Sequence, residues 1–391
     1  MTVRTLTIPL RPGSPAMQRT TSVYLDLLRF LAAAVVFAGH AYPQRLTGGV
    51  PALWRFWGFG NDAVMVFFVL SGFVIAYVAD QKERTLKSYS TSRFARLYSV
   101  AVPAIVLTVV ADAIGSRLAP ALYSAHWFAT DNPAWRIAAN LLFVNELWFT
   151  SVRPFSNVPF WSLGYEFWYY AIFAAALYLG SWHRVAALAI IVLVVGPKIL
   201  LLLPVWLLGV WVYRGTKTRA LSEKAGGALA LGTLACYAAF HLLDGPKLLE
   251  GATARWLGGE VVERLNFSKG FLGSYVIGIL VALHLVGISA VSHRLRLFLP
   301  ERPIRYLASF TFSLYLFHYP LLFFFASLVE STGTTAERGF LVPVATLLAV
   351  WALGEVTERR KSTVKRWVKA SYEAVVRTGR RCMMGLASSR R

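Results

Sequence analysis

The feature that most constrains this chain is a succession of apolar stretches long enough to cross a lipid bilayer. A bilayer core about 30 Å thick needs roughly 20 apolar residues in a helix, since lipid leaves backbone polar groups no partner outside the segment. Only 15% of the 391 residues are charged, whereas soluble domains carry about 25%. We therefore predict an all-α integral membrane protein. Its ten predicted spans are 23–41, 61–79, 98–115, 161–180, 185–196, 199–213, 226–243, 271–291, 307–329 and 340–355.

Three segments are not predicted to span. Residues 1–20 are polar and contain proline, so we expect a flexible cytoplasmic N-terminus and no cleavable signal peptide. The apolar stretch 137–149 is too short to cross and is predicted to be re-entrant or interfacial. Residues 358–391 form a basic tail, which we expect in solvent or on anionic lipid. The predicted membrane domain is 21–357.

The positions of lysine and arginine predict the orientation. With the N-terminus inside and ten crossings, 28 of the 40 basic residues fall in inside segments and 11 in outside segments, as the positive-inside rule requires. A further crossing by 137–149 would exchange the later loops and remove this bias. We therefore predict that both termini are cytoplasmic. The formal net charge of +21 then reflects topology, and no nucleic-acid partner is expected.

The first span carries ionisable residues at positions where lipid disfavours them. Asp26 and Arg29 are three residues apart and can pair on one helix face. Arg29 and His40 are eleven residues apart, which places them within about 20° of the same face and roughly 16 Å apart along the axis. Ionisable residues inside a membrane are candidate functional residues. The alternative is that Arg29 extends to the interface and His40 ends the helix before Pro43.

Polar residues at the cytoplasmic ends of the next two spans extend this candidate site. Ser71 and Gly72 interrupt an aromatic run, which would let a ligand or another helix approach closely. Arg93 and Arg96 are three residues apart at the start of the third span. Two guanidinium groups on one face can hold a phosphate-rich ligand, although ordinary anchoring of the span would also explain them.

Two later spans each carry one further candidate. Glu166 lies just inside the predicted outer edge, among aromatic residues. A carboxylate in such surroundings suits a proton-holding or histidine-orienting role, and pairing with an arginine of an outer loop is the alternative. His318 lies near mid-membrane before Pro320 and is equally consistent with a core histidine and a catalytic one.

Five stretches in this order resemble the motifs of the membrane acyltransferase family 3, and together they cover about residues 20–355. They are Arg29 with His40, FFVLSGF at 67–73, Arg93-x-x-Arg96, WSLGYE at 161–166 and SFTFSLYLFHYP at 309–320. Three positions depart from the family pattern. Ser92 replaces the first of two adjacent arginines, Ser99 replaces a common proline, and Phe167 replaces a second acid, so Glu166 is left as the single carboxylate.

The resemblance implies transfer of an acyl group, usually acetyl, from acyl-coenzyme A to a hydroxyl, often of a glycan, by a protein of the bacterial inner membrane. It implies His40 as the general base, with Glu166, Arg29 and Asp26 supporting it. The donor, acetyl-coenzyme A in the simplest case, is expected at Arg93, Arg96, Ser71 and Gly72, and the acceptor at Trp161, Ser162, Trp168, Tyr169, Tyr315 and His318. Anchoring at the membrane interface is an alternative for Trp161, Trp168 and Tyr169.

Several possibilities stay open on the sequence alone. No metal is expected, because Cys236 and Cys382 offer no thiolate site, and no fused extracytoplasmic domain is expected. A proton-coupled transporter would also use intramembrane ionisable residues and spans broken near Pro197 and Pro204, although no internal repeat is visible. A non-catalytic scaffold would leave these residues unexplained. The acceptor can be an exopolysaccharide, an O-antigen, a lipid-linked oligosaccharide, a lipochitin signal or a small metabolite.

Overall fold

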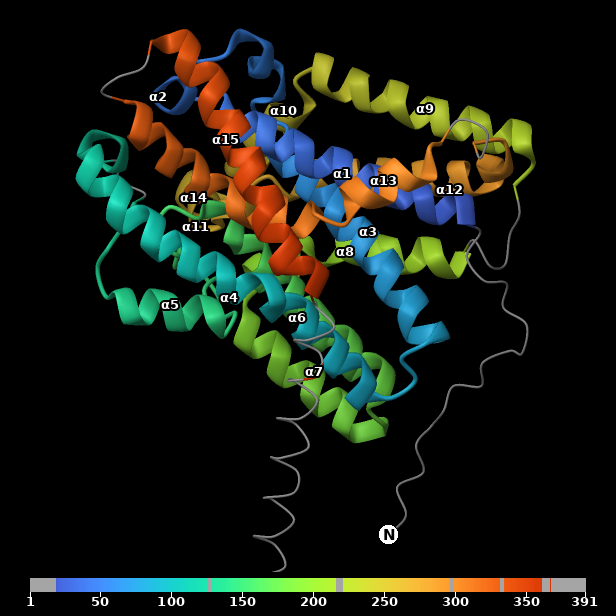
Figure 1. Ribbon diagram of the computed structural model, residues 1–391. Coiled ribbons are helices and arrows are strands. Elements are labelled where there is room, and N and C mark those ends of the chain that lie inside the picture. The colour runs from blue at the N-terminus through green and yellow to red at the C-terminus, as the bar shows by residue number, and fades with distance from the viewer. Residues whose placement is uncertain are drawn as a thin grey trace, which may run out of the picture.

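The protein is a bundle of helices, as the sequence predicts. A computed structural model describes residues 19–124, 128–215, 221–295, 299–330 and 334–360, together with Arg366. Within these ranges the secondary structure is helical and contains no strand (Figure 1). The predicted fold class is therefore confirmed. The predictions for residues 1–18 and for the tail beyond 360, Arg366 apart, lie outside the described residues.

Each predicted span corresponds to one long helix. Eight of these helices are long and apolar enough to cross a membrane, and the other two, α6 and α7, have 18 and 15 residues. The ten are α1 (Arg19–Ala41), α3 (Gly60–Gln81), α4 (Leu86–Leu118), α6 (Trp161–Tyr178), α7 (Ser181–Val195), α8 (Pro197–Gly215), α9 (Glu223–Leu242), α12 (Phe271–Leu295), α14 (Thr311–Val329) and α15 (Thr335–Val356).

Short helices and 3₁₀ turns make the connections. The stretch predicted to be re-entrant or interfacial contains the end of a nine-residue helix, α5, followed by an irregular segment up to Asn157. A helix of that length cannot cross a bilayer. The short elements are α2 (Gln44–Thr47), α5 (Pro133–Leu141), α10 (Gly245–Leu257), α11 (Gly259–Arg264), α13 (Glu301–Ala308), η1 (Pro51–Phe56), η2 (Pro120–Tyr123), η3 (Val158–Phe160), η4 (Asn266–Ser268) and η5 (Glu358–Arg360).

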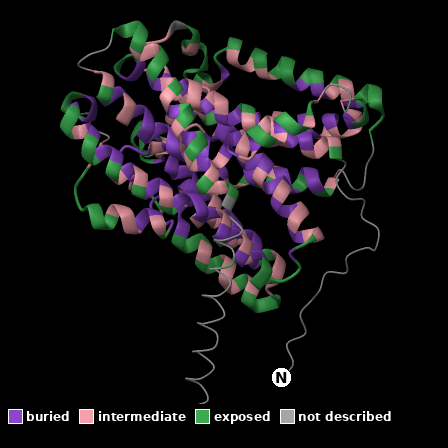
Figure 2. Cartoon of the chain, viewed as in Figure 1, coloured by how far each residue is buried: buried purple, intermediate pink, exposed green. Residues whose placement is uncertain are grey.

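The outside of the bundle is apolar, as a lipid-facing surface requires. Buried residues concentrate in the middle of the bundle, whereas α9 and α15 present many exposed ones (Figure 2). Only 17% of the most apolar window of α9 and 22% of that of α15 is buried, against 72% for α14. Leu231 on α9 and Leu348 on α15 are among the large apolar side chains left exposed. Water would disfavour such a surface, so these helices contact lipid.

Two glycines bring α3 and α8 into direct backbone contact at the centre of the bundle. A Cβ atom added to Gly72 would lie 2.0 Å from the carbonyl oxygen of Trp206. One added to Gly209 would lie 1.9 Å from that of Val69. Small residues let membrane helices approach this closely. Gly72 thus serves helix packing and does not face a ligand, so its prediction as a donor-binding residue is wrong.

Candidate functional site

The ionisable residues of the first span all face one neighbour, the α13–α14 segment. Arg29 donates a hydrogen bond to the Ala308 carbonyl oxygen at 3.3 Å, and the ring of His40 contacts that of His318. The two contacts are eleven residues apart on α1 and ten apart on the partner segment, so the helices run side by side in the same direction. The predicted stripe on α1 is therefore buried against α14.

His40 and His318 form a hydrogen-bonded pair whose geometry determines the proton positions. His318 Nδ1 lies 2.8 Å from the Leu314 carbonyl oxygen, which can only accept, so Nδ1 carries the proton. In a neutral ring His318 Nε2 is then an acceptor, and His40 Nδ1 donates to it at 2.8 Å. A neutral His40 is left with its lone pair on Nε2. That atom can accept a proton from a substrate.

Glu166 does not occupy the position that the sequence suggested. Its Oε1 accepts hydrogen bonds from the Ser71 hydroxyl at 2.8 Å and from the Tyr170 hydroxyl. The residue that holds the His40 ring is His318, and the prediction that Glu166 orients His40 is wrong. No pattern within one helix reveals which side chain of another helix comes within hydrogen-bonding distance, so the sequence offered no means to choose between them.

A cavity of about 220 Å³ lies between α1, α3, α4, α6 and α14. Along α14 its lining ends at Tyr315, one helical turn before His318. There the Tyr315 and Ser162 hydroxyls are 2.9 Å apart, and the Phe67 ring packs edge-on against Tyr315 with centroids 5.6 Å apart. The cavity therefore approaches the histidine pair and stops one turn short of it. Its charged and hydroxyl-bearing lining residues are Ser22, Asp26, Arg29, Ser71, Tyr77, Arg96, Ser162, Glu166, Tyr170, Thr311, Tyr315 and Glu358.

The two arginines of the third span have different surroundings. The Arg93 guanidinium is buried and bonds both carboxylate oxygens of Glu83, at 2.9 and 3.0 Å. Arg96 lines the cavity, where its guanidinium lies 5.9 Å from the ring centroid of Phe312. Among the described residues Arg96 has no side-chain hydrogen-bond partner. Of the predicted pair, only Arg96 is available to a ligand in the cavity.

Arg29 is the second cation of the cavity, and Asp26 holds it in place. Asp26 accepts from Arg29 at 2.8 Å and from Arg305 at 2.9 Å. The Arg29 Nε atom is buried and has no hydrogen-bond partner in the described part of the chain. Asp26 was predicted to support His40, but it belongs to an ion-pair network at the opposite end of the cavity.

Glu358 is a cavity residue that the sequence analysis missed. It follows the last span directly and was assigned to the tail. Its carboxylate accepts from the Ser313 backbone N–H at 2.9 Å and hydroxyl at 3.0 Å, which caps the first turn of α14. Burial raises the pKa of Glu358 above its ordinary value, while the Ser313 bonds and the charges of Arg96 and Arg29 act in the opposite direction. Its position just after an apolar span was the available signal.

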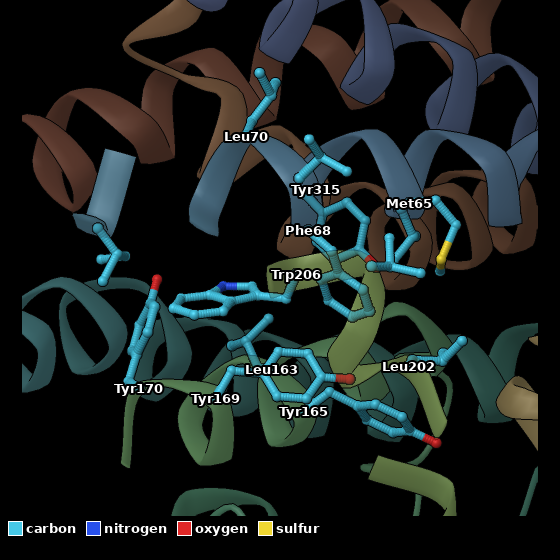
Figure 3. Packing of buried hydrophobic residues seen from close by; sticks show 14 of the residues in the cluster. Met65, Phe68, Leu70, Leu163, Tyr165, Tyr169, Tyr170, Leu202, Trp206 and Tyr315 are labelled. Atoms are coloured by element: carbon cyan, nitrogen blue, oxygen red, sulfur yellow. The ribbon is translucent and has the colours of Figure 1, made fainter. Parts of the chain in front are cut away.

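Of three aromatic residues predicted to stack on an acceptor, Trp161 and Tyr169 are buried in the protein and Trp168 is partly buried. Tyr169 is fully buried, donates to the Ile199 carbonyl oxygen, and packs with Tyr165 and Trp206 (Figure 3). Trp161 stacks on Phe267 with centroids 4.5 Å apart. Trp168 donates to the Phe143 carbonyl oxygen at 2.9 Å. The prediction of a sugar platform is therefore wrong for Trp161 and Tyr169, which an interface belt does not describe either, and it stays a prediction for Trp168.

Comparison with known proteins gives a consistent result. The profile of the acyltransferase domain named acyltransferase 3 matches residues 22–354. The peptidoglycan O-acetyltransferase OatA of Listeria monocytogenes is 25% identical over 359 residues, 83% of this chain and 53% of that protein. The acyltransferase MdmB of Streptomyces mycarofaciens is 32% identical over 152 residues, 37% of this chain and 36% of that protein. The chain thus spans about half the length of OatA. No solved structure matches.

Proposed function

This chain belongs to the acyltransferase 3 family of membrane proteins, and from that premise we propose that it transfers an acyl group, acetyl in the simplest case, from cytoplasmic acyl-coenzyme A to a sugar or glycan hydroxyl at the opposite side of the membrane. The observation that carries the proposal is the alignment of three features along α1 and α14. Arginines line the cavity at one end, and the Ser162 and Tyr315 hydroxyls close it at the other. His318 follows Tyr315 by one turn on α14 and bonds His40 on α1, whose Nε2 keeps a free lone pair.

The donor enters at the arginine end of the cavity. Coenzyme A carries several phosphate groups, which guanidinium groups bind by paired, charge-assisted hydrogen bonds. Arg96 and the unpartnered Nε of Arg29 supply such donors, and Asp26, Glu166 and Glu358 act electrostatically on them. The narrow pantetheine arm extends past Ser71 toward Tyr315. The thioester then reaches the Ser162–Tyr315 hydrogen bond, which must open for the acyl group to reach His40.

His40 activates the acceptor. Its Nε2 takes the proton of the hydroxyl as the oxygen attacks the thioester carbon, the carbon–sulfur bond breaks, and coenzyme A leaves as a thiolate that is then protonated. His318 is a positioning residue, since its Nε2 accepts from His40 Nδ1 and fixes the useful tautomer. The hydroxyls of Ser162 and Tyr315, which bond each other at the end of the cavity, then donate to the developing oxyanion. A variant mechanism, in which His40 itself carries the acyl group, uses the same atom.

The proposed function is tested with the purified protein in lipid nanodiscs. Radiolabelled acetyl-coenzyme A is added with extracted envelope glycans, and release of coenzyme A is followed together with label in the glycan. Mass spectrometry of envelope and secreted glycans from cells with and without the gene identifies the acceptor by the lost acyl mass. Absence of coenzyme A binding and of label transfer, together with solute uptake into proteoliposomes, would instead support a transporter.

Arg96→Gln is expected to raise the donor KM about tenfold, because one charge-assisted contact to phosphate is lost. Arg93→Gln is the matched control, one turn away on α4 but bonded to Glu83. We expect it to lower thermal stability while the donor KM stays near that of the unmodified protein. Steady-state transfer rates at varied acetyl-coenzyme A measure both. Equal KM values for Arg96→Gln and the unmodified protein would remove Arg96 from the donor site.

A further inference from the structure

On the side of the histidine pair away from the cavity, the aromatic residue Tyr319 contacts His40. Arg45 and Arg153 lie near Tyr319. The Tyr319 ring packs against the His40 ring with centroids 4.7 Å apart. The guanidinium of Arg45, on α2, is 5.3 Å from the ring centroid of Phe323, and that ring packs edge-on against Tyr319 with centroids 5.3 Å apart. Arg45 itself is exposed. A positive group is therefore placed at the surface, with aromatic rings between it and the proposed base.

Arg153 reaches the same place from a different part of the chain. It belongs to the irregular segment between α5 and α6 and is close enough to act electrostatically on Tyr319. Its guanidinium lies 5.6 Å from the ring centroid of Phe267, the ring that stacks on Trp161. Glu146, the carboxylate that acts on Arg153, is already bonded to Lys198. Two separate connections thus place positive charge around Tyr319.

Exposed aromatic rings lie beside the end of α1 that carries His40. The 3₁₀ turn η1 packs directly on the end of α1, since a Cβ atom at Gly39 would lie 2.9 Å from the Phe56 carbonyl oxygen. Trp54 and Trp57 next to that contact are each 57% exposed, and the Tyr42 ring lies 5.8 Å from the Trp57 ring. Flat aromatic rings with open faces provide apolar contact area for a sugar ring. These tryptophans, unlike the buried Trp161, are accessible.

We propose that the acceptor carries an anionic group, a carboxylate or a phosphate, close to the hydroxyl that is acylated, and that Arg45 and Arg153 bind it. Guanidinium groups recognise both anions by paired hydrogen bonds. The inference rests on the proposed function, because it assumes that the acceptor approaches His40 from the Tyr319 side. The inference predicts that the acceptor is an acidic or phosphorylated glycan and not a neutral one.

The experiment compares octyl β-glucuronide with octyl β-glucuronamide, in which a neutral amide replaces the carboxylate at C6 and every hydroxyl is kept. The full-length protein is placed in phosphatidylcholine nanodiscs, and both binding by calorimetry and acyl transfer from labelled acetyl-coenzyme A are measured. We expect the glucuronide to be preferred about tenfold in each measurement, as one charge-assisted interaction provides. The double variant Arg45→Gln with Arg153→Gln is expected to bring this ratio close to one. Arg55→Gln, a control on η1 whose guanidinium rests on Trp54, is expected to keep the ratio.

Each other outcome has a defined meaning. Equal binding of the two probes, or a ratio that survives the double variant, overturns the inference. Tighter binding of phosphatidylglycerol that depends on the two arginines, with no discrimination between the sugars, would assign them to lipid headgroups and also overturn it. A preference for the glucuronide in binding without transfer to either probe would support the anion site and contradict the proposed acyl transfer, so the two failures are distinguishable.

Discussion

Replacing His40 by alanine is expected to lower the rate of acyl transfer by about 10²–10⁴-fold, the range that general-base catalysis contributes. The reason is that His40 Nδ1 donates to His318, which leaves the lone pair of His40 on Nε2, where it can take the proton of the acceptor. Alanine has no such group. The alanine variant keeps the apolar face of α1 and should still insert into the membrane. The measurement is the rate of label transfer from saturating acetyl-coenzyme A, normalised to the amount of folded protein in the membrane.

The buried histidine His284 provides the control. It lies on α12 and is bonded to the Tyr24 hydroxyl at 2.6 Å and to Thr233 at 3.1 Å, outside the cavity lining. We expect His284→Ala to affect stability and to leave the rate per folded molecule nearly unchanged. His318→Gln, whose amide oxygen can accept from His40, should lose less rate than His318→Ala. Full activity of His40→Ala, or an equal loss in His284→Ala, would contradict the assignment of His40 as the base.

The fold could be predicted from the sequence because its signals act within single helices. Spans of apolar residues give the helices, and the spacing of Arg29 and His40 places both on one face, as their contacts with Ala308 and His318 bear out. The short stretch 137–149 was separated from the spans by its length and by the bias of lysine and arginine between the loops. These predictions need only the rise and turn of a helix and the thickness of lipid.

The contacts between helices could not be predicted in this way. Arg93 and Arg96 look equivalent in a helical pattern, yet Glu83 lies beside the first and the cavity beside the second. Glu166 was predicted to orient His40 because it is the single carboxylate of its motif, but its partners are Ser71 and Tyr170. Which group each of these side chains contacts depends on its neighbours on other helices, and these neighbours come together only through tertiary packing.

A buried ion pair between Lys198 and Glu146, next to the segment that carries Arg153, could not be predicted for the same reason. Lys198 appeared in the sequence as part of a break between two spans. In the structure its ammonium group is fully buried, 2.5 Å from a Glu146 carboxylate oxygen, and also bonds the Thr150 carbonyl oxygen. Ser151 donates to the other Glu146 oxygen at 2.6 Å. This cluster joins the irregular segment before α6 to the start of α8.

Lys198→Met is therefore expected to lower the free energy of unfolding by about 3–5 kcal/mol, because it leaves the Glu146 carboxylate buried without a counter-charge. Adding Glu146→Gln should recover most of the loss, since the remaining groups are then neutral.

Lys269→Met is the control. Lys269 pairs with Glu250 at 3.2 Å, and its side chain is 41% exposed. Such exposed pairs contribute at most about 1 kcal/mol to stability. Denaturant unfolding in detergent, followed by tryptophan fluorescence, measures all three. Equal losses for Lys198→Met and Lys269→Met would mean that water or a rearranged loop compensates Glu146, and the segment carrying Arg153 would then be held by its backbone contacts instead of by this pair.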